Sequence, residues 1–392
     1  MNRIRLLMLF SDTGGGHRSA GEAVIQAIEE RYPNQFQIQF VDAFKDYAPP
    51  PLNYLPALYP DMVRYPTLWK VGYRLLDGRR RAQVLNRSAW LYVRRAMNRL
   101  IKEHSADLVV SFHPLFIAPY LYAERNPRIP FIVVVTDLVS TPAFWFNKQV
   151  DLTLVPTEEA RQRALQNGLP PDRVQVTGLP VDQRFCAPVD NRNRFRSELG
   201  WPEDLPMVLL VGGGEGMGPL LETARAIAAL DCELGLAVVT GRNTRLRQEL
   251  QKFDWEIPTF LYGFERRMPQ LMRAADLIVT KAGPGTIIEA VNSHLPMVLY
   301  SRLPGQEDGN VDYVMDNGLG VWAPGPRQSA LAVRRWLRSP GLLEDATQRC
   351  RQIARPDAAD RIAEAIAGTF RESRSPASPD GRYSASAQRS AR

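Results

Sequence analysis

The 392-residue sequence predicts an α/β protein made of two doubly wound domains, each a parallel sheet covered by helices on both faces. Short apolar runs alternate with helical stretches along most of the chain, which is typical of this class. Runs such as "PFIVVVTD" and "LPMVLLVGGG" are apolar on both faces, as expected for buried parallel strands. The chain is also long enough to form two ordinary domains with cores of their own.

The boundary between the domains is expected where the composition changes. Residues 184–205 are rich in proline, asparagine and charge, so we expect one domain at 1–185 and the other at 190–345. A C-terminal helix at 346–371 is expected to cross back to the first domain, and the Ser/Arg/Pro/Ala-biased residues 373–392 are expected to be disordered. The predicted strands lie at 5–10, 37–42, 108–112, 131–136, 152–156 and 174–177, and then at 207–211, 234–240, 259–262, 277–280 and 297–300.

Charge and cysteine content narrow the function classes. The net charge of +7 favours anionic partners, but no recognisable nucleic-acid-binding module accompanies it, so we expect no nucleic-acid partner. Cys186, Cys232 and Cys350 are far apart and form no CxxC pair, which indicates a reducing compartment and no zinc site. No apolar run approaches the roughly 18–20 residues that a membrane-spanning helix needs.

Residues 47–100 interrupt the alternation, because aromatic side chains are interleaved with arginines there. A helix at a membrane surface has this composition, with rings at headgroup depth and cations facing anionic lipid. An ordinary amphipathic helix pair with a solvated basic face would show the same pattern. The residues predicted to contact the acceptor or the membrane, from this stretch and from nearby strand ends, are Gly16, Trp69, Tyr73, Arg79, Arg80, Arg81, Trp90 and His113.

The first glycine-rich turn, "SDTGGGHRSAGE" at 11–22, follows the first predicted strand. His17 therefore lies at the carboxyl end of a strand, where an imidazole can serve as a general base near neutral pH. A histidine in such a place is often only structural, but the glycine turn before it favours a functional role. Asp137 ends another strand of the same sheet and is predicted to orient or assist His17.

Two further strand-to-helix turns lie in the second domain. "LLVGGGEGMGPL" at 209–220 and "IVTKAGPGTIIEA" at 278–290 each place glycines between a strand and a helix, the arrangement in which backbone N–H groups hold phosphate. Neither matches the dinucleotide or P-loop fingerprints. Glu289 lies one helical turn further on, within reach of a ribose diol, although it would also complement the helix dipole. "SRLPGQEDGNVDYV" at 301–314 offers side chains suited to sugar hydroxyls.

These stretches resemble the monogalactosyldiacylglycerol synthases and their diacylglycerol glucosyltransferase relatives, which are family 28 glycosyltransferases. Matching segments run in order from residue 11 to about 325. They are "SDTGGGH", "SFHPL", "VVTDL", "GLPV", "GGGEGMGP", "GFE", "TKAGPGTI" and "PGQE" followed by "GNV". The resemblance implies the GT-B architecture, in which two Rossmann-like domains face each other across a cleft. One departure is Asp182, which follows "GLPV" where plant members tend to have arginine.

The resemblance also implies roles for individual residues. His17 and Asp137 would be catalytic, with His17 taking the proton of the diacylglycerol hydroxyl. The UDP diphosphate would be held by residues 214–218 and 281–286, the ribose by Glu289, uracil by Gly263 and Phe264, and the hexose by Gln306 and Glu307. The full donor set is Gly214, Glu215, Gly216, Met217, Gly218, Thr240, Gly241, Arg242, Gly263, Phe264, Lys281, Ala282, Gly283, Pro284, Gly285, Thr286, Glu289, Gln306, Glu307 and Asn310.

The expected function is therefore inverting transfer of a hexose from UDP-hexose to 1,2-diacylglycerol at the cytoplasmic face of a membrane, with anionic lipids as further partners. No DxD motif is present, so no metal and no other cofactor are expected, and helix termini would stabilise the leaving diphosphate. "TGGGH" favours galactose as the hexose. The alternatives are a glucosyltransferase, possibly processive, and a non-catalytic module that binds UDP-sugar and anionic lipid.

Overall fold

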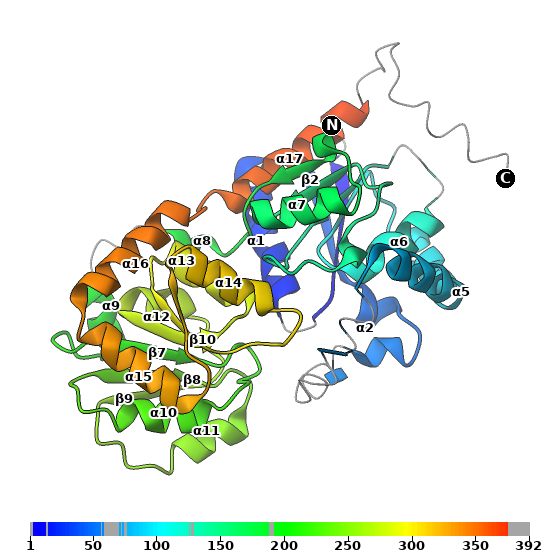
Figure 1. Cartoon of the computed structure of the whole chain (residues 1–392). Coiled ribbons are helices and arrows are strands. Elements are labelled where there is room, and N and C mark those ends of the chain that lie inside the picture. Colours follow the sequence, from blue (N-terminus) through cyan, green and yellow to red (C-terminus); the bar gives the residue numbers. More distant parts are fainter. Residues whose placement is uncertain are drawn as a thin grey trace.

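The computed structural model consists of two lobes, each built on one parallel sheet (Figure 1). It describes residues 3–12, 15–55, 57–58, 70–71, 73, 77–124, 126, 129–187 and 192–374. Within these ranges no helix is both long enough and apolar enough to span a bilayer. The α/β class with two parallel sheets is confirmed.

The first lobe contains a six-stranded parallel sheet in the order β2-β1-β3-β4-β5-β6. Residues 6–9 of β1 are completely buried, because the central strand is covered by helices on both faces. The strands are β1 (Ile4–Phe10), β2 (Phe36–Asp42), β3 (Leu108–Ser111), β4 (Phe131–Val134), β5 (Leu152–Val155) and β6 (Val174–Val176). The helices are α1 (Gly16–Arg31), α2 (Ala43–Tyr47), η1 (Leu52–Tyr54), α5 (Arg79–Glu103), α6 (Pro114–Ala123), η2 (Ala143–Trp145), α7 (Glu158–Gln166) and η3 (Pro171–Arg173). The short helix α8 (Gln183–Cys186) follows and packs against the core of the second lobe.

The second lobe contains another six-stranded parallel sheet, in the order β12-β11-β10-β7-β8-β9. Its strands are β7 (Met207–Val211), β8 (Gly235–Val239), β9 (Thr259–Tyr262), β10 (Leu277–Lys281), β11 (Met297–Ser301) and β12 (Gly320–Trp322). Its helices are α9 (Arg192–Leu199), α10 (Leu220–Ala228), α11 (Thr244–Leu250), α12 (Met268–Ala274), α13 (Pro284–Asn292), α14 (Asp308–Asp316) and α15 (Pro326–Leu337). Every predicted strand range corresponds to a strand, and β12 is a further strand that was not predicted.

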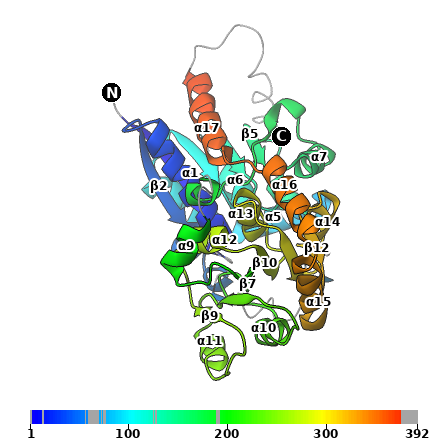
Figure 2. The ribbon, with the colours of Figure 1, turned by 90° about the vertical axis from the view of Figure 1, so that its left-hand side faces the viewer.

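The C-terminal part of the chain runs from the second lobe back along the first (Figure 2). The region 346–371, where one helix was expected, contains parts of two: α16 (Pro340–Ile353) and α17 (Ala358–Arg374), of which α17 packs on the first lobe as expected. Pro356 explains the break, since proline has no N–H group to donate and disfavours a helical conformation at the preceding residue. α17 buries Ile362 and Ile366 against α1 in the core of the first lobe. Residues 375–392 lie outside the described residues.

Both sheets change strand order at a point that matters for binding. In the first sheet the chain leaves β1 for β2 on one side and returns to β3 on the other; in the second sheet β7 lies between β8 and β10 in the same way. Loops at the carboxyl ends of such neighbouring strands diverge, which leaves a crevice where doubly wound folds bind ligands. A ligand is therefore expected to bind at the loops after β1 and β3 or at those after β7 and β10.

Candidate functional site

His17 lies in the first turn of α1, directly after the loop that follows β1. Gly15 precedes the helix with a φ of 80°, a left-handed conformation that favours glycine. The structure does not describe Thr13 and Gly14, so the middle of the predicted glycine turn lies outside the described residues. Gly16 is the first residue of the helix and is exposed.

The ring of His17 is held by a residue that follows β4, two strands away from β1 in the sheet. Its Nδ1 lies 2.7 Å from the hydroxyl oxygen of Thr136, which follows β4. Burial lowers the pKa of His17 to about 4, although the Phe112 carbonyl opposes this shift. At neutral pH the ring is therefore uncharged and has a lone pair that can accept a proton. Thr136 was not predicted as a site residue.

His113 packs edge-on against His17, with ring centroids 4.8 Å apart. It precedes α6, and its Nδ1 accepts a hydrogen bond from the backbone N–H of Leu115 at 3.3 Å, so it caps that helix. Burial lowers its pKa well below the usual value, which keeps its ring uncharged. His113 thus meets His17 at the carboxyl edge of the first sheet as part of the wall behind it.

Asp137 lies next to Thr136 but its carboxylate has other partners. Oδ2 accepts a hydrogen bond from Trp145 Nε1 at 2.6 Å, and Oδ1 accepts one from Gln306 Nε2 at 3.5 Å. Burial raises the pKa of Asp137 to about 6. Asp137 was predicted to orient or assist His17, and among the described residues it is Thr136 that contacts the His17 ring. Neither Trp145 nor the link to the second lobe was predicted.

In the second lobe the glycine loop, residues 212–219 between β7 and α10, packs tightly on the turn after β8. Gly213, Gly216 and Gly218 have φ values of 72°, 60° and 88°. A Cβ at Gly216 would clash with the Thr240 carbonyl oxygen, and Arg242 N donates to the Gly214 carbonyl at 2.8 Å. The loop therefore depends on glycine for both its conformation and its close packing. Met217 accepts a hydrogen bond from the Tyr300 hydroxyl through its carbonyl oxygen.

Lys281 lies between the two glycine-rich turns at the end of β10. Its Nζ donates to Glu307 Oε1 at 2.5 Å, and Glu307, only 3% exposed, also accepts from Leu303 N at 2.7 Å. The Lys281 side chain is within van der Waals reach of a Cβ placed on Gly213 or Gly283. A partly buried ammonium group next to two strand-to-helix turns is suited to an anionic ligand. The turn then enters α13, which begins at Pro284 and includes Gly285 and Thr286.

An exposed aromatic ring follows β9 and is linked through Arg242 to the glycine loop at 212–219. Phe264 is 58% exposed, follows β9 and Gly263, and has the guanidinium of Arg242 over its ring at 4.7 Å. Arg242 also forms an ion pair with Glu215 of the glycine loop at 2.6 Å. The turn Thr240–Arg242, with Gly241 at a φ of 58°, brings these groups together. A solvent-facing ring in this position can stack on a flat ligand ring.

Three polar groups of this region lack partners among the described residues. Glu289, in the second turn of α13, has no hydrogen bond or ion pair there, and burial together with the Asp182 charge raises its pKa to about 7. The buried side-chain oxygens Gln306 Oε1 and Asn310 Oδ1 also have no partner there. Asn310 Nδ2 meanwhile donates to the Ala282 carbonyl at 2.9 Å. Buried polar atoms are normally paired, so these point to a polar ligand.

The expected acceptor and membrane residues fall into several environments. Trp69 lies outside the described residues. Tyr73 does not face outward as expected: its hydroxyl donates to the Ser140 carbonyl at 2.6 Å and its ring lies against Gly305 of the second lobe. Trp90 is half-buried and packs against Tyr122. Arg79, Arg80 and Arg81 are exposed in the first turn of α5.

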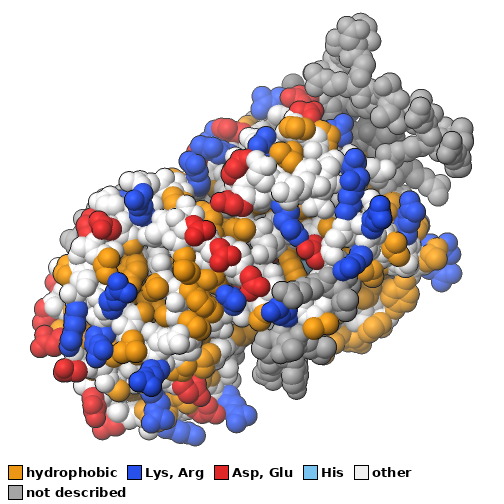
Figure 3. All heavy atoms as spheres, in the orientation of Figure 1, with side chains coloured by type: hydrophobic (Ala, Val, Ile, Leu, Met, Phe, Trp, Pro, Cys, Tyr) orange, Lys and Arg blue, Asp and Glu red, His pale blue; other side chains and the backbone are white. Residues whose placement is uncertain are grey.

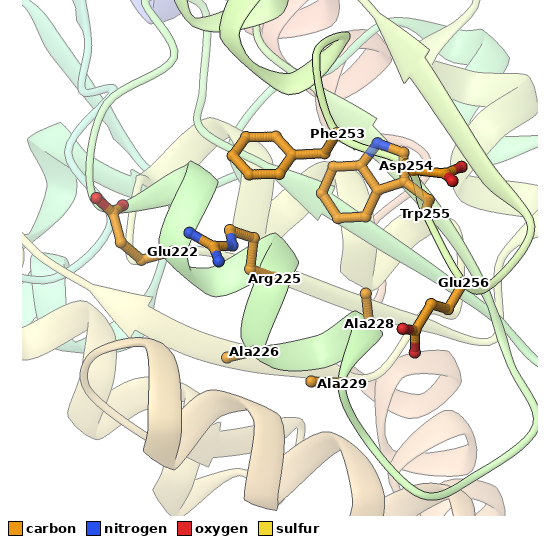
Figure 4. Close-up of a pocket in the computed structure, with 9 residues that line it drawn as sticks. All are labelled: Glu222, Arg225, Ala226, Ala228, Ala229, Phe253, Asp254, Trp255 and Glu256. Carbon is orange, nitrogen blue, oxygen red and sulfur yellow. The ribbon is translucent and has the colours of Figure 1, made fainter.

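A hollow of about 500 Å³ lies elsewhere on the second lobe, between α10 and the residues before β9 (Figure 4). Arg225 covers the ring of Phe253 at 4.9 Å, and Glu222, Asp254 and Glu256 surround it. The hollow lies near the amino ends of the strands, and no predicted site residue lines it.

Comparisons with known proteins agree with this division of the chain. Residues 17–181 match a family described as monogalactosyldiacylglycerol (MGDG) synthase, and residues 207–321 match the glycosyltransferase family 28 C-terminal domain. The chain is 39% identical over 370 residues to the chloroplastic monogalactosyldiacylglycerol synthase of Spinacia oleracea, covering 91% of this chain and 71% of that one. With monogalactosyldiacylglycerol synthase 1 of Arabidopsis thaliana the identity is 38%, covering 91% and 69%.

Solved structures show the same fold at low sequence identity. MurG of Acinetobacter baumannii has a TM-score of 0.60 at 18% identity and covers 93% of this chain and 99% of that one. The lipopolysaccharide glycosyltransferase WaaG has a TM-score of 0.56 at 17% identity, covering 93% and 100%. The fold of the chain is therefore GT-B, with two Rossmann-like lobes, as the resemblance implied.

Proposed function

Since the chain belongs to the monogalactosyldiacylglycerol synthase family and is a glycosyltransferase, we propose that it transfers galactose from UDP-galactose to the free hydroxyl of 1,2-diacylglycerol and releases UDP. The observation that carries this proposal is the arrangement of the two switch points. One presents an uncharged imidazole, His17, and the other presents Lys281 between two glycine-rich turns. The first group suits deprotonation of a hydroxyl, and the second suits a diphosphate.

The reaction is a single displacement at the anomeric carbon. In the tautomer that serves as base, Nδ1–H of His17 donates to Thr136 Oγ1, and Nε2 takes the proton of the diacylglycerol hydroxyl. The hydroxyl oxygen forms the new bond to the anomeric carbon as the bond from that carbon to the phosphate oxygen breaks. UDP leaves with the electron pair, and the configuration inverts because attack and departure occur on opposite faces.

The departing diphosphate gains negative charge, which the second lobe would stabilise through Lys281 and the N–H groups that begin α10 and α13. No metal is required in this scheme. Glu289 would accept hydrogen bonds from the ribose hydroxyls, Phe264 would stack on uracil, and Gln306 with Asn310 would bind the hexose. Thr286 and Glu215 would complete the walls around the diphosphate.

The outer face of α5 supports contact with a membrane that contains the acceptor. Val84 and Leu91 are 64% and 70% exposed and lie two helical turns apart on one face. Arg80, Arg87 and Arg94 flank them, and the only acidic residue of the helix is Glu103 at its end. Figure 3 shows hydrophobic and basic side chains side by side over this part of the first lobe. Apolar side chains among arginines fit the surface of an anionic bilayer.

We further propose that the protein binds at the cytoplasmic face, which agrees with its three free cysteines. The test of the function is a donor competition assay. Vesicles containing diacylglycerol and anionic lipid are incubated with the protein and equal amounts of UDP-galactose and UDP-glucose, with and without EDTA. We expect β-monogalactosyldiacylglycerol as the main product in both samples. Glucolipid as the main product would favour glucosyl transfer, and nucleotide binding without any transfer would favour the non-catalytic alternative. A product that disappears with EDTA would contradict metal independence.

A further inference from the structure

The residues that follow β4 contact functional groups of both lobes. We call residues 136–140 the seam segment. At one end Thr136 meets His17 of the first lobe at 2.7 Å. At the other end Ser140 Oγ accepts a hydrogen bond from the backbone N–H of Gly309, in the first turn of α14, at 3.1 Å. The same short segment thus reaches the candidate base and the loop that carries the candidate hexose-binding residues.

The seam segment and α14 are packed so closely at this contact that Gly309 has no room for a side chain. A Cβ on Gly309 would lie 2.8 Å from Ser140 Oγ and 2.8 Å from Val139 Cγ1, so only glycine allows the α14 backbone to approach this closely. Tyr73 adds a further link, because its hydroxyl bonds to the Ser140 carbonyl while its ring lies against Gly305. The seam segment and residues 305–309 are therefore closely packed against each other.

Asp137 is the second residue of the seam segment and directs its carboxylate to Gln306. The carboxylate is buried and holds the Gln306 amide nitrogen through Oδ1, while Trp145 fixes Oδ2. An amide group that donates from its nitrogen to a fixed acceptor cannot turn over without losing that bond. Its oxygen, Oε1, is then left facing away from Asp137, and this atom is buried without a partner among the described residues.

We propose that Asp137 is a positioning residue for the donor sugar, which holds the Gln306 amide so that its oxygen accepts a hydrogen bond from a hexose hydroxyl. This inference rests on the proposed function and reassigns Asp137 from a partner of His17 to a partner of the donor. It makes the hexose-binding group of the second lobe depend on a carboxylate of the first. The sugar site is then complete only when the seam segment and residues 305–309 are in contact.

The first experiment compares Asp137→Asn with the wild type by calorimetry and by steady-state kinetics. Asparagine keeps the shape of the side chain but has only one oxygen, so it cannot accept from both Trp145 and Gln306. We expect the dissociation constant for UDP-galactose and the donor KM to rise about tenfold. The dissociation constant for UDP, which lacks the sugar, stays within about twofold, and kcat at saturating donor falls no more than about threefold. A matched control is Asp151→Asn, directly before the neighbouring strand β5, where the carboxylate accepts from Phe131 N at the start of β4.

A double-mutant cycle with Gln306→Leu supplies the second measurement. If Asp137 acts through Gln306, the double variant binds UDP-galactose no more weakly than Gln306→Leu alone. Additive losses would overturn the proposal. A different pattern in Asp137→Asn would also overturn it: kcat falls more than tenfold, donor affinity is unchanged, and the acid limb of the pH profile shifts. That pattern would show that Asp137 acts on His17 and not on the donor.

Different results contradict the proposed function and the role of Asp137. If the wild type does not bind UDP-galactose, the proposed function itself is wrong. If the wild type transfers galactose but both Asp137→Asn and Gln306→Leu bind UDP-galactose normally, only this inference is wrong. Should Asp137→Asn unfold, the ratio of UDP-galactose to UDP affinity in Gln306→Leu decides, because the Gln306 side chain is half-buried and its replacement keeps the hydrogen bond between Trp145 and Asp137. A ratio equal to that of the wild type contradicts the inference.

Discussion

The hydroxyl oxygen of Thr136 lies 2.7 Å from Nδ1 of His17, so the ring is held by the end of β4 and not by its own helix. Because β4 and β1 are separate strands of one rigid sheet, the position of the imidazole is fixed relative to the seam segment. If His17 is the base, Thr136 takes the place that a carboxylate has in many base–orienter pairs.

Replacing Thr136 by valine removes the hydroxyl and keeps the shape of the side chain. We expect kcat to fall about tenfold, because the ring loses the bond that selects its tautomer and orientation. The dissociation constant for UDP-galactose is expected to stay within about twofold. Thr153→Val is a suitable control: Thr153 is a buried residue of β5 whose hydroxyl has no partner within the described part of the chain, so its loss should change neither quantity. An equal fall in both variants would contradict a role for Thr136 in orienting His17.

We expect Glu289 to make donor binding depend on pH. Its pKa is raised to about 7, so below pH 7 the free protein carries a neutral carboxylic acid at this position. Ribose hydroxyls bind the charged carboxylate more strongly, and binding therefore releases a proton under these conditions. The affinity for UDP-galactose should rise between about pH 5.5 and 7 and then level off.

Titration calorimetry across this range, in buffers of different ionisation enthalpy, measures both the affinity and the proton release. UDP-galactose is the appropriate ligand because neither phosphate of this diester titrates near pH 6–7, unlike the terminal phosphate of UDP. Glu289→Gln should bind more weakly at pH 8 and lose most of the pH dependence. If the variant keeps the same slope as the wild type, another group is responsible for it.

The ion pair between Lys281 and Glu307 links stability to donor binding. Lys281→Met leaves the buried Glu307 carboxylate without its cation, and we expect the free energy of unfolding to fall by about 3 kcal/mol. Adding Glu307→Gln should restore much of the stability, because the uncompensated charge is removed. Affinity for UDP-galactose should remain at least tenfold weaker in both variants, since neither has the ammonium group. Denaturant unfolding and calorimetry provide the two measurements. Normal donor affinity in Lys281→Met would exclude Lys281 from the diphosphate site.

The sequence alone predicts the sheets well and the connections between lobes poorly. Strands such as β7 and β10 are buried on both faces, so continuous apolar runs identify them. β12 was missed because it is a short edge strand of three half-buried residues. The glycine-rich turns were predicted together with their helices because a strand, glycines and a helix start form a local pattern.

The partners of Asp137 could not be predicted in the same way. Trp145 lies on a 3₁₀ turn beyond an irregular loop, and Gln306 belongs to the other lobe. Contacts between residues that are 169 positions apart depend on how the lobes pack, and no local pattern encodes that. The same holds for Tyr73. The aromatic and basic residues around it in the sequence suggested a membrane surface, but its hydroxyl donates to the Ser140 carbonyl within the protein.

The exposed apolar residues of α5 provide a test of membrane contact. Replacing both Val84 and Leu91 by serine should weaken binding to vesicles of diacylglycerol and anionic lipid about tenfold, because less apolar surface is removed from water. Transfer to a short-chain, soluble diacylglycerol should be unaffected. Leu331→Ser changes an exposed leucine of α15 in the second lobe, 43% exposed, and serves as the control. Vesicle sedimentation measures the binding, and equal retention of all three proteins on vesicles would argue against this face.

The role of His17 as the base is tested by two measurements on His17→Ala. One is the single-turnover rate with saturating UDP-galactose and diacylglycerol vesicles, and the other is the affinity of the variant for UDP-galactose. If His17 is the base that faces a donor held by the second lobe, the rate falls about 10²- to 10⁴-fold while the dissociation constant for UDP-galactose changes less than about threefold. A single-turnover rate close to that of the wild type would show that another group accepts the proton, and the account of this site would be wrong.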